Sequence, residues 1–426
     1  MKYSLRNKIY IDRVLFGFIC FFLNVLSRIL GLLLKRDHTV HSKNVKSIAI
    51  SKYLGLGSII RSTTMIVNLK KEFPQAKILF ITVKGNVQFF EALKEIDEVI
   101  TIDDRNIKSM IRSTLILLFK LWKNKIDLFF NLEVYSNYST MISILSLARN
   151  RYGFFRKSTE IKYGLYTHLI YFNIFQNITD IYLQMIKQSI GVVYTKEMIP
   201  LDIPEKYRLD VEKYLFSLNF KKDKKIILLG INANASELCL ERRYPSENFV
   251  NIIEYLVSIQ EKKIVLILIG SPSERSYIQE KIYDKLSSKA QQQTYNACGN
   301  LSLLAVIQLI KKMDIFLTND SGPMHFAFNM KTPTISLWGP ENYEHFCLNP
   351  QAGENIYLYK KIYCSPCVHQ LDSPCCQGNN LCVKSIDYRE ILNEIFKLLK
   401  IDICLEYETL EISDEILGSV ISLRRK

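Results

Sequence analysis

The sequence lacks the signatures by which nucleic-acid-binding proteins are usually identified. Although its 426 residues carry a formal net charge of +14, there is no zinc-finger, helix-turn-helix or RNP-like pattern and no basic run interleaved with aromatic residues. The G-x-G-x-x-G dinucleotide fingerprint and the P-loop lysine are missing as well. We therefore expect the positive charge to face a membrane surface or a phosphorylated substrate, and we expect no nucleic-acid partner.

The N-terminal apolar segment has no small-residue cleavage site after it, which argues against a cleaved signal peptide. Residues 14–34 are long enough for a transmembrane helix and are flanked by Lys and Arg on both sides. A polar and small-residue face favours instead a helix in the membrane interface, with its cations toward anionic head groups. A true span with a small-residue packing seam is the alternative. The residues of this face are Arg13, Gly17, Asn24, Arg28, Gly31 and Lys35.

In either case we predict that residues 1–42 are a membrane-associated helix. If this helix is only an anchor, deletion of residues 1–36 should leave the rest of the chain folded and soluble.

The sequence also lacks a secretory signal, so its ten cysteines are expected to be reduced thiols rather than disulfides. Five of them lie between residues 364 and 382, in the order C-x2-C, C-C and C. This spacing resembles a four-thiolate zinc site, and a loop of structural thiols is the alternative. We predict a structural zinc site without a catalytic role. Its ligands would be Cys364, Cys367, Cys376 and Cys382, with His369 as a substitute.

Short apolar segments alternate with helical stretches along most of the chain. Strands are predicted at residues 45–50, 77–83, 98–102 and 127–132, and again at 225–230, 263–270, 313–317 and 334–337. Alternating β and α segments predict parallel sheets with helices on both faces. We therefore expect an α/β protein with two doubly wound, Rossmann-like domains that face a cleft. The expected divisions are the helix at 1–42, an N-terminal domain at 43–200, a linker at 201–224, a C-terminal domain at 225–395 and a tail at 396–426.

A polar knot follows the predicted strand at residues 313–317. Its sequence, TNDSGP, precedes a helical stretch, so it lies at the carboxyl end of a strand, where open α/β sheets bind ligands. Backbone N–H groups of Ser321 and Gly322 at the start of this helix would form an anion site. A plain βα turn with Ser321 as N-cap is the alternative.

The segment TNDSGPMHFAF…TPTISLWGP resembles the signature of the heptosyltransferase-like glycosyltransferases, family nine of the sugar transferases. The pieces LGLGSIIRS, NANASEL…RRYPSENF, IGSPSER and CSPC follow the family order, and the resemblance covers roughly residues 45–395. It implies a two-domain enzyme of the GT-B type, with the acceptor on the N-terminal domain and a nucleotide sugar on the C-terminal domain. It also implies transfer of a sugar such as heptose to a lipid-linked or envelope saccharide, at the cytoplasmic face of a bacterial inner membrane.

The sequence has no D-x-D pair, which metal-dependent sugar transferases usually carry, so we expect transfer without a metal or other cofactor. With the resemblance, we expect an inverting transfer. The leaving diphosphate would then be stabilised by the amides of the polar knot and by arginine. The resemblance assigns Asp320 and His325 to the donor pocket, and Glu274 suits a ribose contact. Singly these residues also fit a turn former, a helix histidine and a helix-start charge. The predicted donor-binding residues are Ser236, Arg242, Arg243, Glu274, Asp320, Ser321, Gly322 and His325.

The first glycine turn departs from the family pattern. The family has Gly-Asp there, with the Asp as proposed general base, whereas this chain has Gly57 and Ser58. A serine of ordinary pKa cannot accept the acceptor's proton unaided. We predict Glu133, directly after a strand, as the base, with a solvated loop carboxylate as the alternative. His168, in residues 163–173 beside the acceptor, is the second choice. Without a base, the chain would be a degenerate nucleotide-sugar-binding or scaffold protein.

Overall fold

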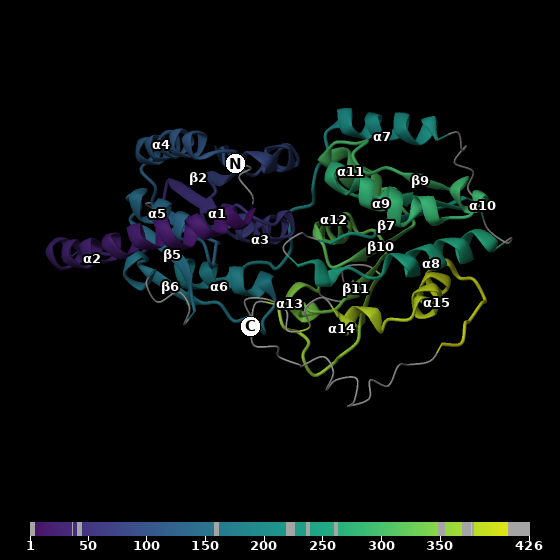
Figure 1. Cartoon of the computed structure of the whole chain (residues 1–426). Helices are drawn as coiled ribbons and strands as arrows, with labels where there is room; N and C mark the ends of the chain where they lie inside the picture. The colour runs from purple at the N-terminus through teal and green to yellow at the C-terminus, as the bar shows by residue number, and fades with distance from the viewer. Residues whose placement is uncertain are drawn as a thin grey trace. The chain divides into compact units, whose positions relative to one another are not determined.

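The structure is a computed structural model of the chain. It describes residues 5–35, 37–40, 45–156, 162–218, 226–235, 239–259, 263–347, 354–368, 376 and 379–407. These fall into two compact units, Met1–Ile199 and Pro200–Lys426 (Figure 1). Each unit contains a six-stranded sheet of parallel strands. The predicted α/β class with two doubly wound sheets is therefore confirmed, whereas the finer division of the chain stays a prediction.

The first sheet has the strand order β3-β2-β1-β4-β5-β6. The order reverses between β1 and β4, and ligands bind at such a switch point in open α/β sheets. The predicted bounds of β2 and β3 coincide with the observed ones, and β5 and β6 were not predicted. The strands are β1 Ser47–Ser51, β2 Lys77–Val83, β3 Glu98–Ile102, β4 Leu128–Asn131, β5 Asn150–Phe155 and β6 His168–Tyr171.

Helices cover both faces of the first sheet. The connections β1→β2 and β4→β5 run in opposite directions, so right-handed crossovers place α3 and α5 on opposite faces. Helix α6 packs against α3. Helix α4, α5 and the N-terminal helical segment share one apolar core on the other face. The elements are α1 Leu5–Ile11, η1 Asp12–Phe16, α2 Gly17–Leu34, α3 Leu56–Glu72, η3 Lys84–Ala92, α4 Ile107–Asn124, α5 Asn137–Leu145 and α6 Ile178–Ile190.

The N-terminal helix, which we define as residues 5–34, is docked on the first unit. The Asp12 carboxylate accepts hydrogen bonds from the backbone N–H of Asn137 at 2.8 Å and of Tyr138 at 2.9 Å, and so caps α5. Phe16 and Cys20 are buried in the shared core. Such contacts make the helix part of the domain.

The orientation of this helix differs from the one expected from the sequence. Asn24, on the face predicted to meet head groups, is buried in the protein, and the Ser27 hydroxyl donates to the Gly164 carbonyl at 2.7 Å. Apolar side chains such as Phe18 and Phe22 are exposed instead. Within the described residues, Asn7–Leu33 is the stretch of helix that is long and apolar enough to cross a bilayer.

The second sheet has the order β12-β11-β10-β7-β8-β9. Its core lies between the sheet and helices that include α8 and α15. Helix α7 falls in the predicted linker and packs against α11. The strands are β7 Ile226–Asn232, β8 Lys263–Leu268, β9 Thr294–Asn296, β10 Ile315–Asn319, β11 Thr334–Trp338 and β12 Asn355–Tyr359. The helices are α7 Glu205–Ser217, η5 Leu240–Arg242, α8 Ser246–Ser258, η6 Pro272–Glu274, α9 Arg275–Lys281, η7 Tyr283–Lys285, α10 Ser288–Gln291, α11 Leu303–Lys311, α12 Gly322–Met330, α13 Tyr343–Phe346, α14 Leu381–Lys384 and α15 Tyr388–Leu399.

Candidate active site

The polar knot lies where β10 ends and α12 begins. Ser321 has an extended backbone and makes no side-chain cap to α12. Its hydroxyl donates instead to the Asn232 Oδ1 atom at 2.8 Å, which ties the turn to the end of β7. A Cβ added at Gly322 would meet no atom within 4 Å. The space beside Gly322 at the start of α12 is therefore open, and the free backbone N–H groups at such a helix start can bind an anion.

Arg242 lies between two carboxylates at this edge of the second sheet. Its Nη1 atom is 3.2 Å from Asp320 Oδ2, and its Nη2 atom donates to Glu341 Oε2 at 2.6 Å. All three side chains are largely buried, with 17%, 4% and 3% exposed. Burial alone would lower the pKa of Arg242, but the two carboxylates outweigh it and the pKa is raised. The guanidinium is thus a permanent cation that holds two carboxylates in place.

Glu274 caps the helix start after β8. Its carboxylate accepts from the Asn234 side-chain amide at 2.6 Å and from the backbone N–H of Ser271 at 2.5 Å. The second contact is one half of a capping box. The Arg243 guanidinium lies over the Tyr277 ring, 4.5 Å from its centroid. Both predicted residues are therefore held by neighbours before any ligand binds.

Of the two remaining predicted donor-site residues, the structure describes His325 and does not describe Ser236. His325 is buried in α12, with its ring edge-on to Phe328 and Phe346 at centroid distances of 6.2 and 5.7 Å. Ser236 lies outside the described residues. The structure thus brings Arg242, Asp320, Ser321 and Gly322 to one sheet edge and adds Glu341, which the sequence reasoning missed. An acidic residue directly after the WGP turn was the available signal.

Glu133 follows β4 in the first unit and binds the turn that follows β1. Its Oε1 atom accepts from the backbone N–H groups of Tyr53 at 2.7 Å and Leu54 at 3.1 Å. Its Oε2 atom is 3.1 Å from Lys52 Nζ, with about a tenth of each side chain exposed. Burial alone would lower the pKa of Lys52, but attraction to Glu133 outweighs it and the pKa is raised. The carboxylate of Glu133 therefore already has donors on both oxygens.

Ser58 lies in the first turn of α3, just after this loop. Its side chain lies near the Tyr182 phenol of α6, and burial raises the pKa of that phenol. Gly55 precedes the helix with a φ of 81°, a backbone conformation that favours glycine. The sequence reasoning missed Lys52 and Tyr182. A lysine directly after an inner strand was the signal for the first, and the second comes from a helix distant in sequence.

His168 lies at a different position along the strands of the first sheet than Glu133. It is the first residue of β6 and is in register with Tyr152 of β5, which in turn pairs with Phe130 of β4. The two rings of His168 and Tyr152 stack at a centroid distance of 4.3 Å. Glu133 lies beyond the end of β4, whereas His168 lies within the sheet. Burial lowers the pKa of His168, so the imidazole is neutral at pH 7.

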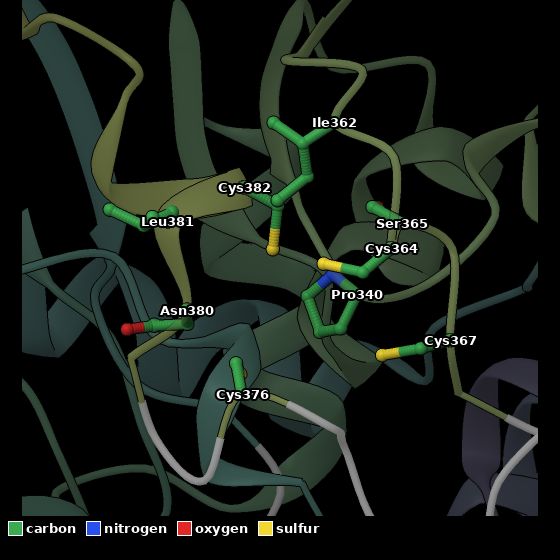
Figure 2. A pocket seen from close by; sticks show the side chains of 9 residues that line it. All are labelled: Pro340, Ile362, Cys364, Ser365, Cys367, Cys376, Asn380, Leu381 and Cys382. Carbon is green, nitrogen blue, oxygen red and sulfur yellow. The ribbon is translucent and has the colours of Figure 1, made fainter. Parts of the chain in front are cut away.

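The four predicted zinc ligands line one cavity together with Pro340 and Asn380 (Figure 2). The described cysteines are free thiols. Burial, with the neighbouring thiols, raises the pKa of the Cys382 thiol to about 12. Among the described residues, no group of three or more ligating side chains is placed to hold a metal ion. The zinc prediction is therefore not supported, and His369 lies outside the described residues.

Comparison with known proteins identifies a family whose sequence pattern this chain matches. The family model of glycosyltransferase family 9 (heptosyltransferase) matches residues 119–376. The chain is 26% identical over 219 residues to lipooligosaccharide heptosyltransferase 2 of Campylobacter jejuni, a match that covers 51% of this chain and 63% of that protein. It is 24% identical over 362 residues to lipopolysaccharide heptosyltransferase 1 of Campylobacter coli, with 82% and 98% covered.

Solved structures agree in fold. An E. coli ADP-heptose lps heptosyltransferase II matches with a TM-score of 0.65 and 18% identity, over 84% of this chain and 99% of that one. A family 9 glycosyl transferase of Veillonella parvula matches with a TM-score of 0.69 and 20% identity, over 83% and 97%. The chain spans only 63% of the length of the first curated relatives that it matches.

Proposed function

Because this chain belongs to glycosyltransferase family 9, we propose that it moves a sugar of the heptose type from a nucleoside-diphosphate donor to a saccharide of the lipopolysaccharide type. The curated relatives are heptosyltransferases that act on lipooligosaccharide or lipopolysaccharide, and one structural neighbour is named for ADP-heptose. These names give no support to the degenerate scaffold alternative. The observation that carries the proposal is the open start of α12 beside the buried Arg242.

The donor diphosphate would bind at the start of α12. Backbone N–H groups from Gly322 onward, helped by the helix dipole, would stabilise the negative charge that grows on the leaving diphosphate. Arg242 would act mainly by holding Asp320 and Glu341 in place, since both carboxylates already occupy its guanidinium. Glu274 and Arg243 would flank the nucleoside part of the donor. None of these roles requires a metal ion.

The transfer would invert the anomeric centre. The acceptor hydroxyl oxygen attacks the anomeric carbon, the bond to the diphosphate oxygen breaks, and the hydroxyl proton passes to a base. The contacts of Glu133 support a positioning role for the turn at residues 52–54. A role as base requires one of its donors to give way when the acceptor binds. Variants of Lys52 and Glu133, described below, distinguish these roles.

The enzyme would work at the cytoplasmic face of the inner membrane, where it would meet a lipid-linked acceptor. The exposed apolar side of the N-terminal helix supports attachment there, and so does the net charge of +14.

The donor site is tested by filling the open space at Gly322. Gly322→Val adds side-chain atoms where a Cβ meets nothing within 4 Å, so the fold should persist. Donor affinity, titrated with ADP-heptose by calorimetry, should fall about tenfold or more. Gly85→Val is the matched control, because its Cβ also meets nothing within 4 Å and it lies in the other unit. Native affinity in Gly322→Val would remove this turn from the donor site.

A further inference from the structure

Helix α4 presents an apolar stripe to solvent. The stripe residues recur at spacings of four, four, four and three, which places them along one side of the helix. Their exposed fractions run from 48% for Ile107 to 66% for Phe119, although this helix also has a buried side in the core of the first unit. We define the α4 stripe as Ile107, Ile111, Leu115, Phe119 and Trp122.

Cations border the α4 stripe. Three exposed basic residues each directly follow a stripe residue, so they lie about 100° further round the helix. Helix α4 contains no Asp or Glu. An apolar stripe edged by Lys and Arg is the pattern of a helix that lies at an anionic lipid surface. We define the α4 cations as Lys108, Arg112 and Lys123.

The α4 stripe belongs to the same helical layer as the N-terminal helix. Tyr138 of α5 connects the two, since its hydroxyl is 2.6 Å from the Thr114 hydroxyl of α4 and its ring is 5.0 Å from the Phe16 ring. Lys8 also forms an ion pair at 2.6 Å with Asp104, just before α4. Because both helices cover one face of one sheet, their exposed apolar sides belong to one side of the unit.

The docked position of the N-terminal helix suits a helix that lies along a membrane. Its contacts run from Asp12 to Ser27, about 22 Å of helix. The buried Lys162 ammonium, which donates to the Val134 and Ser136 carbonyls, is also stabilised by the negative charge of Asp12. Leaving the domain to cross a bilayer would break these contacts. Lying in the interface keeps them and buries the exposed apolar side.

We propose that the N-terminal helix and α4 together form a two-helix surface that binds an anionic lipid bilayer, with the N-terminal helix parallel to the membrane plane. This rests on the proposed membrane attachment and adds α4 as a second, independent contact. It would hold the acceptor-side unit against the leaflet that carries a lipid-linked saccharide. The surface does not depend on the chemistry of sugar transfer.

Tryptophan fluorescence gives a direct test, because the chain contains only two tryptophans. Trp122 is in the α4 stripe and is 48% exposed, whereas Trp338 is fully buried. The full chain is mixed with phosphatidylglycerol–phosphatidylethanolamine vesicles whose acyl chains are brominated. We expect quenching in the native chain and its loss in Trp122→Phe. Vesicle binding without quenching of Trp122 would overturn the proposal, because the N-terminal helix would then bind alone.

Flotation with the same vesicles tests the energetic contribution of α4. The variant Ile111→Ser/Leu115→Ser/Phe119→Ser should bind at least about tenfold more weakly, and neutralising the α4 cations should weaken binding roughly a hundredfold at low salt. The matched control is Leu209→Ser/Phe216→Ser, whose side chains are 45% and 84% exposed on the other unit. Native binding by the α4 variants would overturn the proposal.

A second copy of the chain is the alternative occupant of this surface. If the native chain is a dimer that the apolar α4 variant dissociates while flotation stays unchanged, the proposal is wrong. Turnover on a short water-soluble acceptor should be the same in the native chain and the α4 variants. Absence of turnover in every protein would count against the proposed function and leave the lipid result standing.

Discussion

The two units of the chain place a buried ion pair at the carboxyl edge of their sheets, but they build it differently. In the first unit, Glu133 binds Lys52 and also two backbone N–H groups of the adjoining turn. In the second unit, Arg242 binds two carboxylates, and the neighbouring start of α12 borders open space. One arrangement fixes a loop, and the other fixes two carboxylates beside the start of a helix. Only the second has the form of an anion site.

The units also differ in what supports them. A helix from the far N-terminus caps α5 and stabilises Lys162 in the first unit, so charges there depend on a segment outside the sheet. The second unit draws the partners of Arg242 from its own strand ends. We therefore predict that removing the N-terminal helix destabilises the first unit and that replacing Arg242 destabilises the second unit.

The largest effect is expected from deleting residues 1–36. The deletion removes the Asp12 cap, worth about 1 kcal/mol, and the burial of Phe16, worth about 2 kcal/mol. Together these come to about 3 kcal/mol, a large part of the roughly 5–15 kcal/mol by which folded domains are stable. The deletion also removes the Asp12 charge, which stabilises the buried Lys162 ammonium. We expect the first unit to unfold or become protease-sensitive while the second stays folded, as measured by limited proteolysis with mass spectrometry. Deletion of residues 1–4 is the control. Two protected units would restore the simple anchor expected from the sequence.

Arg242→Met should be the most destabilising single change in the second unit. It leaves Asp320 and Glu341 buried without their cation, which typically costs about 3–5 kcal/mol. Urea unfolding of the second unit measures the loss, and Glu341→Gln in the same background should recover part of it. Arg242 would thus contribute to the stability of the second unit in addition to its predicted place in the donor site. A loss below about 1 kcal/mol would mean that solvent already screens the triad.

Lys52→Met and Glu133→Gln should have similar effects on turnover if Glu133 positions the turn. Each breaks the same buried pair, so we expect a loss of about 3 kcal/mol of stability and roughly a hundredfold in kcat for either. The double variant should cost little more than one of them. If Glu133 is the base, Glu133→Gln alone should abolish the pH dependence of kcat, and Lys52→Met should keep most turnover.

Lys162 should make the first unit more stable as pH rises. Burial, partly offset by Asp12, lowers its pKa from 10.5 to about 8. Between these values the folded lysine has released its proton while the unfolded one keeps it, so the unfolded state binds more protons and stability rises with pH. From pH 8 to 9.5 the gain is about 2 kcal/mol. The urea midpoint of the native chain should rise relative to that of Lys162→Met over this pH range. If the two midpoints change with pH in the same way, Lys162 does not cause the pH dependence.

Ser58→Ala should have the smallest effect. It removes one hydroxyl near the Tyr182 phenol, and we expect a loss of stability of at most about 1 kcal/mol. Turnover should fall much less than in Glu133→Gln, because the hydroxyl is not an effective base. Thermal unfolding and kcat measure both quantities, and Ser62→Ala, on the same helix, is the control. A loss of turnover equal to that of Glu133→Gln would place Ser58 in the acceptor site.

The fold was largely predictable because its inner strands are short apolar runs bounded by polar turns. Strands β2 and β3 were predicted with their observed bounds. Strand β6 is an edge strand with only one buried residue among four, so its sequence has no apolar run to detect. Strand β9 has three residues and two of them are polar. An apolar run in the sequence decided the outcome more than burial did, because edge strand β3 was predicted whereas inner strand β5, with the sequence NRYGFF, was not.

The candidate site was predictable where its residues share a motif, and not where they meet only in space. Asp320, Ser321 and Gly322 are adjacent in sequence, so their common location follows from one turn. Glu341 joins Arg242 across 99 positions, and Glu133 joins Tyr53 across 80. Spacing along the chain contains no information on such partners. The donors of Glu133 support a positioning role that its place in the sequence did not suggest, and its role as the base stays a prediction.

The docked N-terminal helix also sets an order of events on the ribosome. Ser27 leaves the ribosome early, but its partner Gly164 follows 137 positions later. At 5–20 residues per second, roughly 7–27 s pass between the two. For most of that interval the apolar sides of the nascent helix are uncovered, because α5, which ends at Leu145, is synthesised only late in it. A membrane can therefore capture the growing chain before the first unit closes over one side of the helix.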